Sequence, residues 1–173
     1  MEEEFIQSKQ NPRIKALSRL QERAGRRKLG LFAVEGLREL ERCLLAGVEV
    51  REIYFCAEMF KSPRHSEFIS KVRGKIPLCR VSAAAFEKIS NREGCDGILG
   101  VSETWQASLK EIELPKDKPA LILVADSTEK PGNLGAMLRS ADAAGATAVI
   151  LSNPITDLFN PSVIRASQGG CFL

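Results

Sequence analysis

Apolar side chains recur every three residues near the start of the chain. In NPRIKALSRLQERAG they stand at Ile14, Leu17 and Leu20, a spacing typical of one face of a helix. Asn11, followed by a proline, is a suitable cap for this helix, and Gly25 is its predicted end. The chain is therefore expected to open with a helix.

Strand and helix patterns then alternate up to about residue 104. LFAVEG, VREIYFC, IPLCRV and GILGVSE are predicted strands, whereas LRELERCLLAG and SAAAFEKIS have helical spacing. Ser82 is a suitable cap for the SAAAFEKIS helix, and a further helical part is centred on Phe68 and Ile69. This alternation predicts an α/β domain over residues 1–104.

A second unit is predicted after a polar linker. Residues 105–118, WQASLKEIELPKDK, combine charge and proline with few core residues and form the predicted linker. PALILVAD and ATAVILS are apolar strands with a helix between them, which predicts a βαβ unit within residues 119–173. Asn160 is the expected cap of one more helix, which opens at Pro161. Because two strands and two helices cannot cover both faces of a parallel sheet, this unit is expected to pair with another chain or to continue beyond Leu173.

The helix between those two strands carries the candidate chemistry. Its apolar stripe is formed by Leu134, Met137, Leu138, Ala141 and Gly145. Arg139 points away from the stripe, and Asn133 is the expected N-cap. Gly132 and Gly135 allow a tight turn at the carboxyl end of a strand, where open α/β sheets bind ligands. The pattern alone also allows an ordinary loop and cap, with Arg139 as a solvated helix residue.

Composition excludes several classes of protein. The 173 residues are 44% hydrophobic and 27% charged, which suits one or two folded domains. No apolar run is long enough to cross a bilayer, and MEEEFIQSKQ does not have the pattern of a signal peptide, so a cytoplasmic protein without a membrane segment is expected. Neither G-x-G-x-x-G nor G-x-x-x-x-G-K-[ST] occurs, so neither a nicotinamide nor an ATP enzyme is supported.

Metal and disulfide chemistry is not indicated either. The five cysteines are scattered and never form C-x-x-C, so they are expected to be buried small hydrophobic residues. His65 is the only histidine and is predicted to be exposed in a loop, which leaves no histidine metal site and no Ser-His-Asp triad.

Positive charge gathers near the N-terminus, although the net charge is only +3. The stretch from Lys9 to Lys28 holds eight basic residues opposed only by Glu22. Such a segment predicts contacts with nucleic-acid phosphates that fix position without reading sequence; a solvated helix face is the alternative. The residues of this segment expected to touch RNA are Arg13, Lys15, Arg23, Arg26, Arg27 and Lys28.

The stretch EKPGNLGAMLRSADAAG resembles the first motif of the SpoU or TrmH family of RNA ribose 2′-O-methyltransferases, which has an N-x-G-x-x-x-R core. Those positions are Asn133, Gly135 and Arg139, and NPSVIRASQGG is similar to a later family segment. SKQNPRIKAL, GLFAVEGLRELERCLLAG and SNREGCDGILGVSE look like the family's N-terminal RNA-binding domain, so the resemblance covers nearly the whole chain. Lys130 stands where many members have aspartate, and its charge is expected to favour RNA.

The resemblance implies a SPOUT-class α/β fold: a ribosomal-protein-like RNA-binding domain followed by the first part of a trefoil-knot methyltransferase domain. The family's second motif, which is rich in glycine and contains glutamate, and its Ser-Leu-Asn motif have no counterpart before Leu173. The knot region, which holds S-adenosylmethionine and helps to build a homodimer, is therefore expected to be absent from this chain. No cofactor-contacting residue is assigned, and a protein ending at Leu173 is expected neither to form the knot nor to transfer methyl groups.

The same resemblance implies that Arg139 and Asn133 are catalytic. Because arginine is very hard to deprotonate, Arg139 is favoured as a phosphate clamp and charge stabiliser, with general-base action as the alternative. Asn133 would position the arginine or the ribose. The expected function is S-adenosylmethionine-dependent methylation of a ribose 2′-hydroxyl in rRNA or tRNA. A non-catalytic RNA-binding protein with the front half of such an enzyme is the main alternative, and a structural α/β module is a more distant one.

Overall fold

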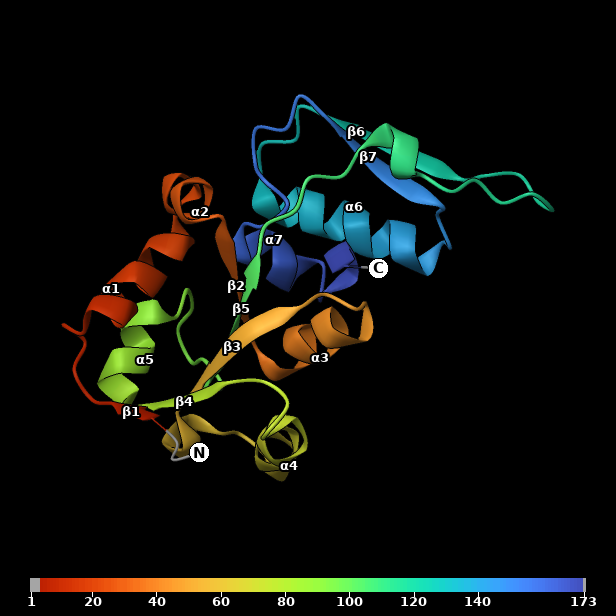
Figure 1. Ribbon diagram of the computed structural model, residues 1–173. Coiled ribbons are helices and arrows are strands. Elements are labelled where there is room, and N and C mark those ends of the chain that lie inside the picture. Colours follow the sequence, from red (N-terminus) through yellow and green to blue (C-terminus); the bar gives the residue numbers. More distant parts are fainter. Residues whose placement is uncertain (1–3, 173) are drawn as a thin grey trace.

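A computed structural model describes residues 4–172 and contains two β-sheets (Figure 1). The spatial order of the five-stranded sheet is β1 (Glu4–Ile6), β4 (Leu78–Val81), β3 (Val50–Phe55), β5 (Ile98–Glu103) and β2 (Leu31–Glu35). The first three of these strands are parallel, and β5 runs antiparallel to both of its neighbours. We call this sheet and its helices the first unit. The α/β prediction is confirmed, although the three-residue strand β1 was not predicted.

Helices cover both faces of this sheet because the strand residues alternate between two apolar clusters. The first unit contains α1 (Pro12–Ser18), α2 (Arg23–Leu29), α3 (Leu37–Leu45), α4 (Pro63–Val72), α5 (Ala83–Ile89), and the 3₁₀ turns η1 (Arg19–Gln21) and η2 (Ala57–Met59). Ala33 and Tyr54 point to the cluster with α1 and α5. Phe32 and Phe55 point to the opposite cluster, with α3 and α4. Asn11 and Ser82 cap α1 and α5 as predicted.

The basic segment is not one helix that ends at Gly25, as predicted, but three short elements. The backbone of Glu22 is extended, which separates η1 from α2, and α2 ends at Gly30 in the left-handed region. Gly25 lies inside α2, where a Cβ would overlap the carbonyl group of Arg19. Its lack of a side chain lets α2 fold back onto η1, which a linear pattern does not reveal.

The second unit begins at β6 (Ile122–Asp126) and confirms the predicted βαβ arrangement. β6 pairs in parallel with β7 (Ala148–Ser152), and α6 (Pro131–Ala143) connects them. The 3₁₀ turn η3 (Leu109–Glu111) precedes this unit, and α7 (Pro161–Ala166) and the 3₁₀ turn η4 (Gly170–Phe172) complete it. Asn160 caps α7 by accepting from the backbone N–H of Ser162, as predicted.

The two units share an apolar contact. Ile164 of α7 is 1% exposed and belongs to the same cluster as Phe32 of β2. Trp105, from the predicted linker, packs edge-on against Phe32 and Phe159, with ring centroids 5.6 and 4.7 Å apart. The start of the predicted linker therefore contributes to this contact rather than crossing solvent.

Two predictions about single residue types have different outcomes. His65 is buried on α4, where its ring stacks on Phe60 and its Nε2 lies 3.3 Å from Asp96, so the prediction of an exposed loop histidine is wrong. Because Pro63 takes the first helical position, His65 lies inside α4, on the same buried side of the helix as Phe68 and Ile69. The cysteine prediction is largely confirmed, because four of the five are buried and Cys171 is half-buried.

Several large apolar side chains of the second unit are exposed. Ile122, Val124 and Met137 have exposed fractions of 39%, 59% and 39%. The prediction that Met137 and Gly145 belong to the buried stripe of α6 is wrong, because both residues are exposed. No helix within residues 4–172 is both long and apolar enough to cross a membrane.

Candidate functional site

α6 begins one turn earlier than its sequence suggested. Pro131 takes the first helical position because its ring already has a helical φ, so Lys130 becomes the N-cap residue. Lys130 makes no capping hydrogen bond through its side chain. Asn133 is therefore the third helical residue, and its prediction as the N-cap is wrong. Its side chain is exposed near the start of the helix.

Gly135, the glycine of the N-x-G-x-x-x-R pattern, lies at a helix crossing. It is buried inside α6, and a Cβ at this position would overlap that of Ala166 and lie 2.8 Å from the backbone nitrogen of Ser167. The expected tight turn therefore does not explain this glycine. It allows α6 and α7 to pack closely, which fixes the direction in which α6 presents its polar side.

Arg139 is exposed and lies off the apolar stripe of α6, as predicted. Its backbone faces η4, since a Cβ on Gly170 would lie 3.7 Å from the Cα of Arg139. Six residues separate Arg139 from Asn133, which places them about 9 Å apart along the axis and about 120° apart around it. The hydrogen bonds found within residues 4–172 include none between these two side chains.

The carboxyl ends of β6 and β7 bring polar side chains together beside the start of α6. We call this strand-end position the crevice, because open α/β sheets bind their ligands there. Asp126, the last residue of β6, accepts hydrogen bonds from Ser127 Oγ and Asn153 Nδ2, each at 3.1 Å. Hydrogen bonds from Ser152, Ser127 and Asn153 hold the pKa of the Asp126 carboxyl below its ordinary value. Ser127 and Asn153 have φ angles of 50° and 46°, a region that residues with side chains rarely occupy. Such strain at strand ends is typical of functional loops, and sequence patterns did not indicate it.

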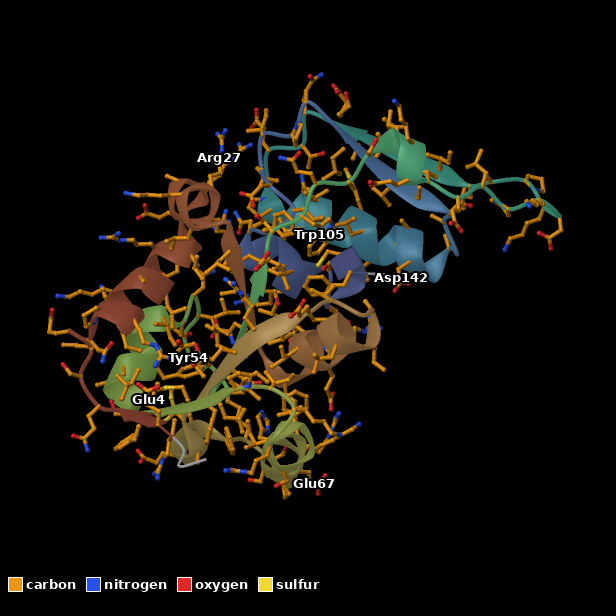
Figure 2. The ribbon with its side chains drawn as sticks, viewed as in Figure 1. Glu4, Arg27, Tyr54, Glu67, Trp105 and Asp142 are labelled. Atoms are coloured by element: carbon orange, nitrogen blue, oxygen red, sulfur yellow. The ribbon has the colours of Figure 1, made fainter. Side chains whose placement is uncertain are left out.

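The loop after β7, residues 153–160, is attached to α2 of the first unit. Arg23 Nη1 donates to the carbonyl of Ile155 at 2.7 Å. Arg26 forms a two-point ion pair with Asp157, with Nε–Oδ1 and Nη2–Oδ2 distances of 3.2 and 2.6 Å. The predicted RNA-binding helix is therefore next to the crevice, and Figure 2 shows Arg27 at the side of the molecule where these loops lie.

The predicted RNA-binding residues fall into two groups. Lys15, Arg23, Arg27, Lys28 and Lys130 are exposed. Arg13 is only partly exposed and donates to Tyr54 and to the carboxylates of Glu4 and Glu52. Burial lowers the pKa of Arg13, but the hydrogen bonds to Glu4, Glu52 and Tyr54 together outweigh this and raise it above its ordinary value. Arg26 is 3% exposed. Of the seven arginines and lysines expected to hold RNA, Arg13 and Arg26 thus have guanidinium groups bound to carboxylates of the chain.

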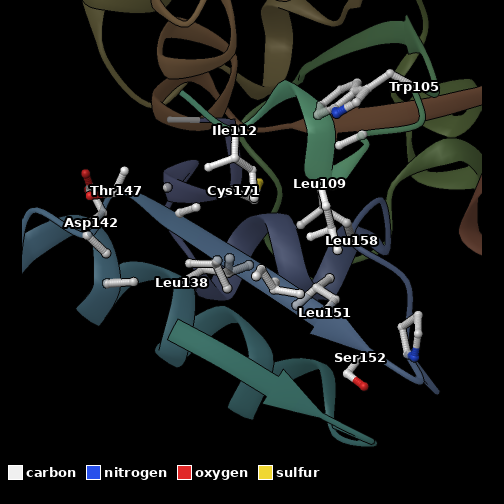
Figure 3. Close-up of a pocket in the computed structure, with 18 of the residues that line it drawn as sticks. Trp105, Leu109, Ile112, Leu138, Asp142, Thr147, Leu151, Ser152, Leu158 and Cys171 are labelled. Carbon is white, nitrogen blue, oxygen red and sulfur yellow. The ribbon is translucent and has the colours of Figure 1, made fainter. Parts of the chain in front are cut away.

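A mainly apolar hollow of about 880 Å³ lies between the linker and β7 (Figure 3). Trp105, Leu109 and Ile112 line it from one side, and Leu138 and Leu151 from the other. Its charged lining residues are Asp142 and Asp157, both acidic. Among residues 4–172, no lysine or arginine lines the hollow. These residues therefore offer no cationic side chain to bind the carboxylate of S-adenosylmethionine, and we assign no donor contact to the hollow.

No group of three or more histidine, cysteine, aspartate or glutamate side chains within residues 4–172 is arranged to hold a metal ion. The thiols of Cys43 and Cys171 are also poor metal ligands at neutral pH. Burial raises the pKa of Cys43 to about 12 and that of Cys171 to about 11, so both stay protonated.

This arrangement, a mixed α/β domain with a basic helix docked on a βαβ unit, coincides with two family models. Residues 11–100 match the MRM3-like substrate binding domain, and residues 120–173 match the SpoU rRNA Methylase family. The chain belongs to the proteins with an MRM3-like substrate binding domain, and its C-terminal segment matches the SpoU rRNA Methylase family. The resemblance found in the sequence is thus confirmed.

Individual relatives agree with this assignment. The 23S rRNA (guanosine(2553)-2′-O)-methyltransferase RlmP of Bacillus subtilis is 30% identical over 170 residues, covering 96% of this chain and 62% of the relative. The human mitochondrial rRNA methyltransferase 3 is 29% identical over 150 residues, covering 85% of this chain and 34% of the relative.

Solved structures share the fold. An RNA 2′-O ribose methyltransferase matches with a TM-score of 0.81 and 42% identity, covering 97% of this chain and 62% of that one. An AdoMet-bound rRNA methyltransferase from Sinorhizobium meliloti matches with a TM-score of 0.81 and 26% identity, covering 98% and 62%. The SPOUT fold class is thereby confirmed. The chain spans about six-tenths of the length of these two solved proteins and of the Bacillus relative.

Proposed function

We propose that these residues form the RNA-holding domain and the opening part of the catalytic domain of an RNA ribose 2′-O-methyltransferase. The enzyme would transfer a methyl group from S-adenosylmethionine to a ribose 2′-hydroxyl in rRNA or tRNA. The observation that carries this proposal is the docking of a basic helix, α2, beside the strand-end crevice of a SpoU methylase unit. Relatives named as 23S rRNA 2′-O-methyltransferases favour rRNA as the substrate.

In the proposed reaction, the 2′-oxygen attacks the donor's methyl carbon, the carbon–sulfur bond breaks to release S-adenosylhomocysteine, and the hydroxyl proton passes to a water molecule. Arg139, exposed on α6, would hold the phosphate next to the reacting ribose and stabilise developing negative charge. Because Asn133 and Arg139 lie on different sides of α6, we assign Asn133 to the ribose and not to the arginine. The donor, when bound, supplies only the electrophilic methyl group.

RNA would lie across α2 and the start of α6. Arg23, Arg27, Lys28 and Lys130 are exposed there, and Lys15 continues the positive charge along α1. Arg13 and Arg26 are left out of the proposed RNA contacts because their guanidinium groups already bind carboxylates of the chain. Phosphate contacts of this kind set the register of the RNA without selecting its sequence.

We further propose that the complete enzyme is a cytoplasmic homodimer. The exposed apolar side chains of β6 and α6 support an interface on the second unit. Light scattering on the purified protein tests this proposal, because a monomeric mass over a wide concentration range would contradict it. The polypeptide of residues 1–173 alone is expected to bind RNA without methylating it.

The decisive experiment is a transfer assay with the protein that carries these residues. It is incubated with tritiated S-adenosylmethionine and a 23S rRNA transcript, and the product is digested with alkali. A 2′-O-methyl group blocks cleavage at its own nucleotide, so label in an alkali-resistant dinucleotide supports the proposal. Label in mononucleotides, which would indicate base methylation, or tight RNA binding without any label, would contradict it.

A further inference from the structure

The contact between α2 and loop 153–160 is built around one nearly inaccessible arginine. Arg26 is 3% exposed, and its four hydrogen bonds occupy four of its five N–H donors. Two bonds go to Asp157, and Nη1 donates to the carbonyls of Leu20 and Gln21 at 2.7 and 2.9 Å. A guanidinium group held in this way has no free edge for a phosphate group.

The loop that Arg26 holds is itself joined to the loop before α6. The backbone N–H of Thr156, next to Asp157, donates to the carbonyl of Thr128 at 3.3 Å. The N–H of Ser127 donates to the carbonyl of Ser152 at 2.9 Å. Thr128 lies two residues before Lys130, the N-cap of α6. A continuous set of contacts therefore runs from α2 through both strand-end loops to the helix that carries Asn133 and Arg139.

The same helix bears the exposed cations proposed to hold RNA. Arg27 and Lys28 follow Arg26 directly and face solvent, while Arg26 faces the loop. Binding of RNA to the outer side of α2 would thus act on an element whose inner side is fixed to the strand-end crevice.

We propose that Arg26 is a positioning residue that couples RNA held on α2 to the crevice through Asp157. The inference rests on the proposed function and adds a role for a pair of residues that do not touch the substrate. RNA bound to α2 would then restrict loop 153–160, and the loop would in turn fix the start of α6 relative to the ribose. Loss of the ion pair between Arg26 and Asp157 should therefore leave RNA affinity unchanged, while RNA no longer restricts loop 153–160 or fixes the start of α6.

Asp157→Ala is the sharpest variant, because Arg26 keeps its two carbonyl bonds and the exposed cations of α2 are unchanged. Asp157→Asn keeps the shape of the side chain and one acceptor oxygen, so it should reduce the RNA-induced protection of loop 153–160 by an intermediate amount. It also keeps the proposal testable if Asp157→Ala does not fold. Asp117→Ala removes an exposed acidic residue from the linker and is the matched control.

Overlapping transcripts that cover 23S rRNA are first compared, and the one that binds most tightly is used. The first measurement is the rate of amide hydrogen exchange in residues 153–160, with and without this RNA. We expect RNA to slow exchange at least fivefold in the wild type and in Asp117→Ala. In Asp157→Ala we expect less than a twofold change, with an RNA dissociation constant within twofold of the wild type. Equal RNA-induced protection in both variants, or RNA affinity that falls in Asp157→Ala, would overturn the proposal.

The second measurement is single-turnover methyl transfer at saturating RNA, where we expect Asp157→Ala to lose at least tenfold in rate. An unchanged rate would overturn the positioning role. If the wild type transfers no methyl group, the proposed function fails, yet the exchange experiment still decides whether Arg26 and Asp157 couple RNA binding to the loop.

Discussion

Gly135 of α6 and Ala166 of α7 face each other so closely that the two helices have no room for a second Cβ. The contact buries Gly135 together with Leu134 and Leu138, the central residues of the second unit's apolar cluster. In an interior packed this tightly, an added methyl group destabilises the fold because its neighbours cannot move far enough to make room for it. Helix packing therefore requires glycine at this position of the family pattern, four positions before Arg139.

Gly135→Ala is expected to lower the free energy of unfolding by about 1–3 kcal/mol, because a methyl group there forces α6 away from α7. Gly132→Ala in the first turn of the same helix is the matched control. It has open space around it, and it should raise stability by about 0.5–1 kcal/mol through its lower entropy in the unfolded chain. Urea titration followed by circular dichroism measures both, and equal stability of the two variants would contradict the packing argument.

Arg139→Ala should abolish methyl transfer in the enzyme while leaving the fold intact. The side chain is exposed and off the core, so unfolding should shift by no more than about 0.5 kcal/mol. Loss of a group that stabilises charge in the transition state lowers turnover by about 100- to 1,000-fold. Lys88→Ala, which removes one exposed charge from α5, serves as the control in the same tritium assay. Retained turnover in Arg139→Ala would move the chemistry to another residue.

Replacing Arg27 and Lys28 by alanine should weaken RNA binding and reduce its dependence on salt. Each lost phosphate contact lowers the slope of log affinity against log salt by about 0.7–0.9, so the pair should remove about 1.5. The matched control is Lys71→Ala with Lys75→Ala. These residues are exposed in and just after α4, at the opposite end of the molecule in Figure 1. Filter binding at several salt concentrations measures the slopes. An equal change in both pairs would mean that α2 has no special role.

The sequence was informative wherever one element carries its own signal. Regular apolar spacing predicted the α/β alternation and the βαβ unit, and short polar residues next to prolines predicted the caps at Asn11 and Asn160. The position of Arg139 off the apolar stripe followed from helical periodicity alone. The predicted limits of the two domains and of the linker, and the roles of Asn133 and Arg139, stay predictions.

The sequence was uninformative where a residue depends on a distant partner. Arg26 and Asp157 are 131 positions apart, so nothing near either residue shows that they pair. By local pattern Arg26 resembles its neighbours Arg27 and Lys28, yet it is buried and they are exposed. The sequence likewise predicts a helix end at Gly25 and a turn at Gly135, because a close approach between two elements leaves no signal in the neighbouring residues. His65 shows the same limit, since its burial depends on Phe60 and Asp96.

Cys171 provides a test of the contact between η4 and the rest of the chain. Burial disfavours its thiolate and raises its pKa from 9.0 to about 11. At pH 8 the native thiolate fraction is then about 1 in 1,000, against about 1 in 10 for the unfolded chain. Native Cys171 should therefore react with iodoacetamide about 100-fold more slowly than in concentrated urea, as measured by peptide mass spectrometry.

The pH dependence of this reaction follows from the sign of the shift. Because the folded pKa lies above the unfolded one, the native rate should rise about tenfold per pH unit from pH 8 to 10, while the rate in urea levels off above pH 9. The same sign means that the thiol's contribution to stability is complete well below pH 9 and is lost as the pH approaches 11. Cys43, with a pKa raised to about 12, should react more slowly still. Rapid alkylation of Cys171 in the native protein at pH 7 would contradict this. It would show that η4 separates from α3 and α6 and so changes the surface next to Arg139.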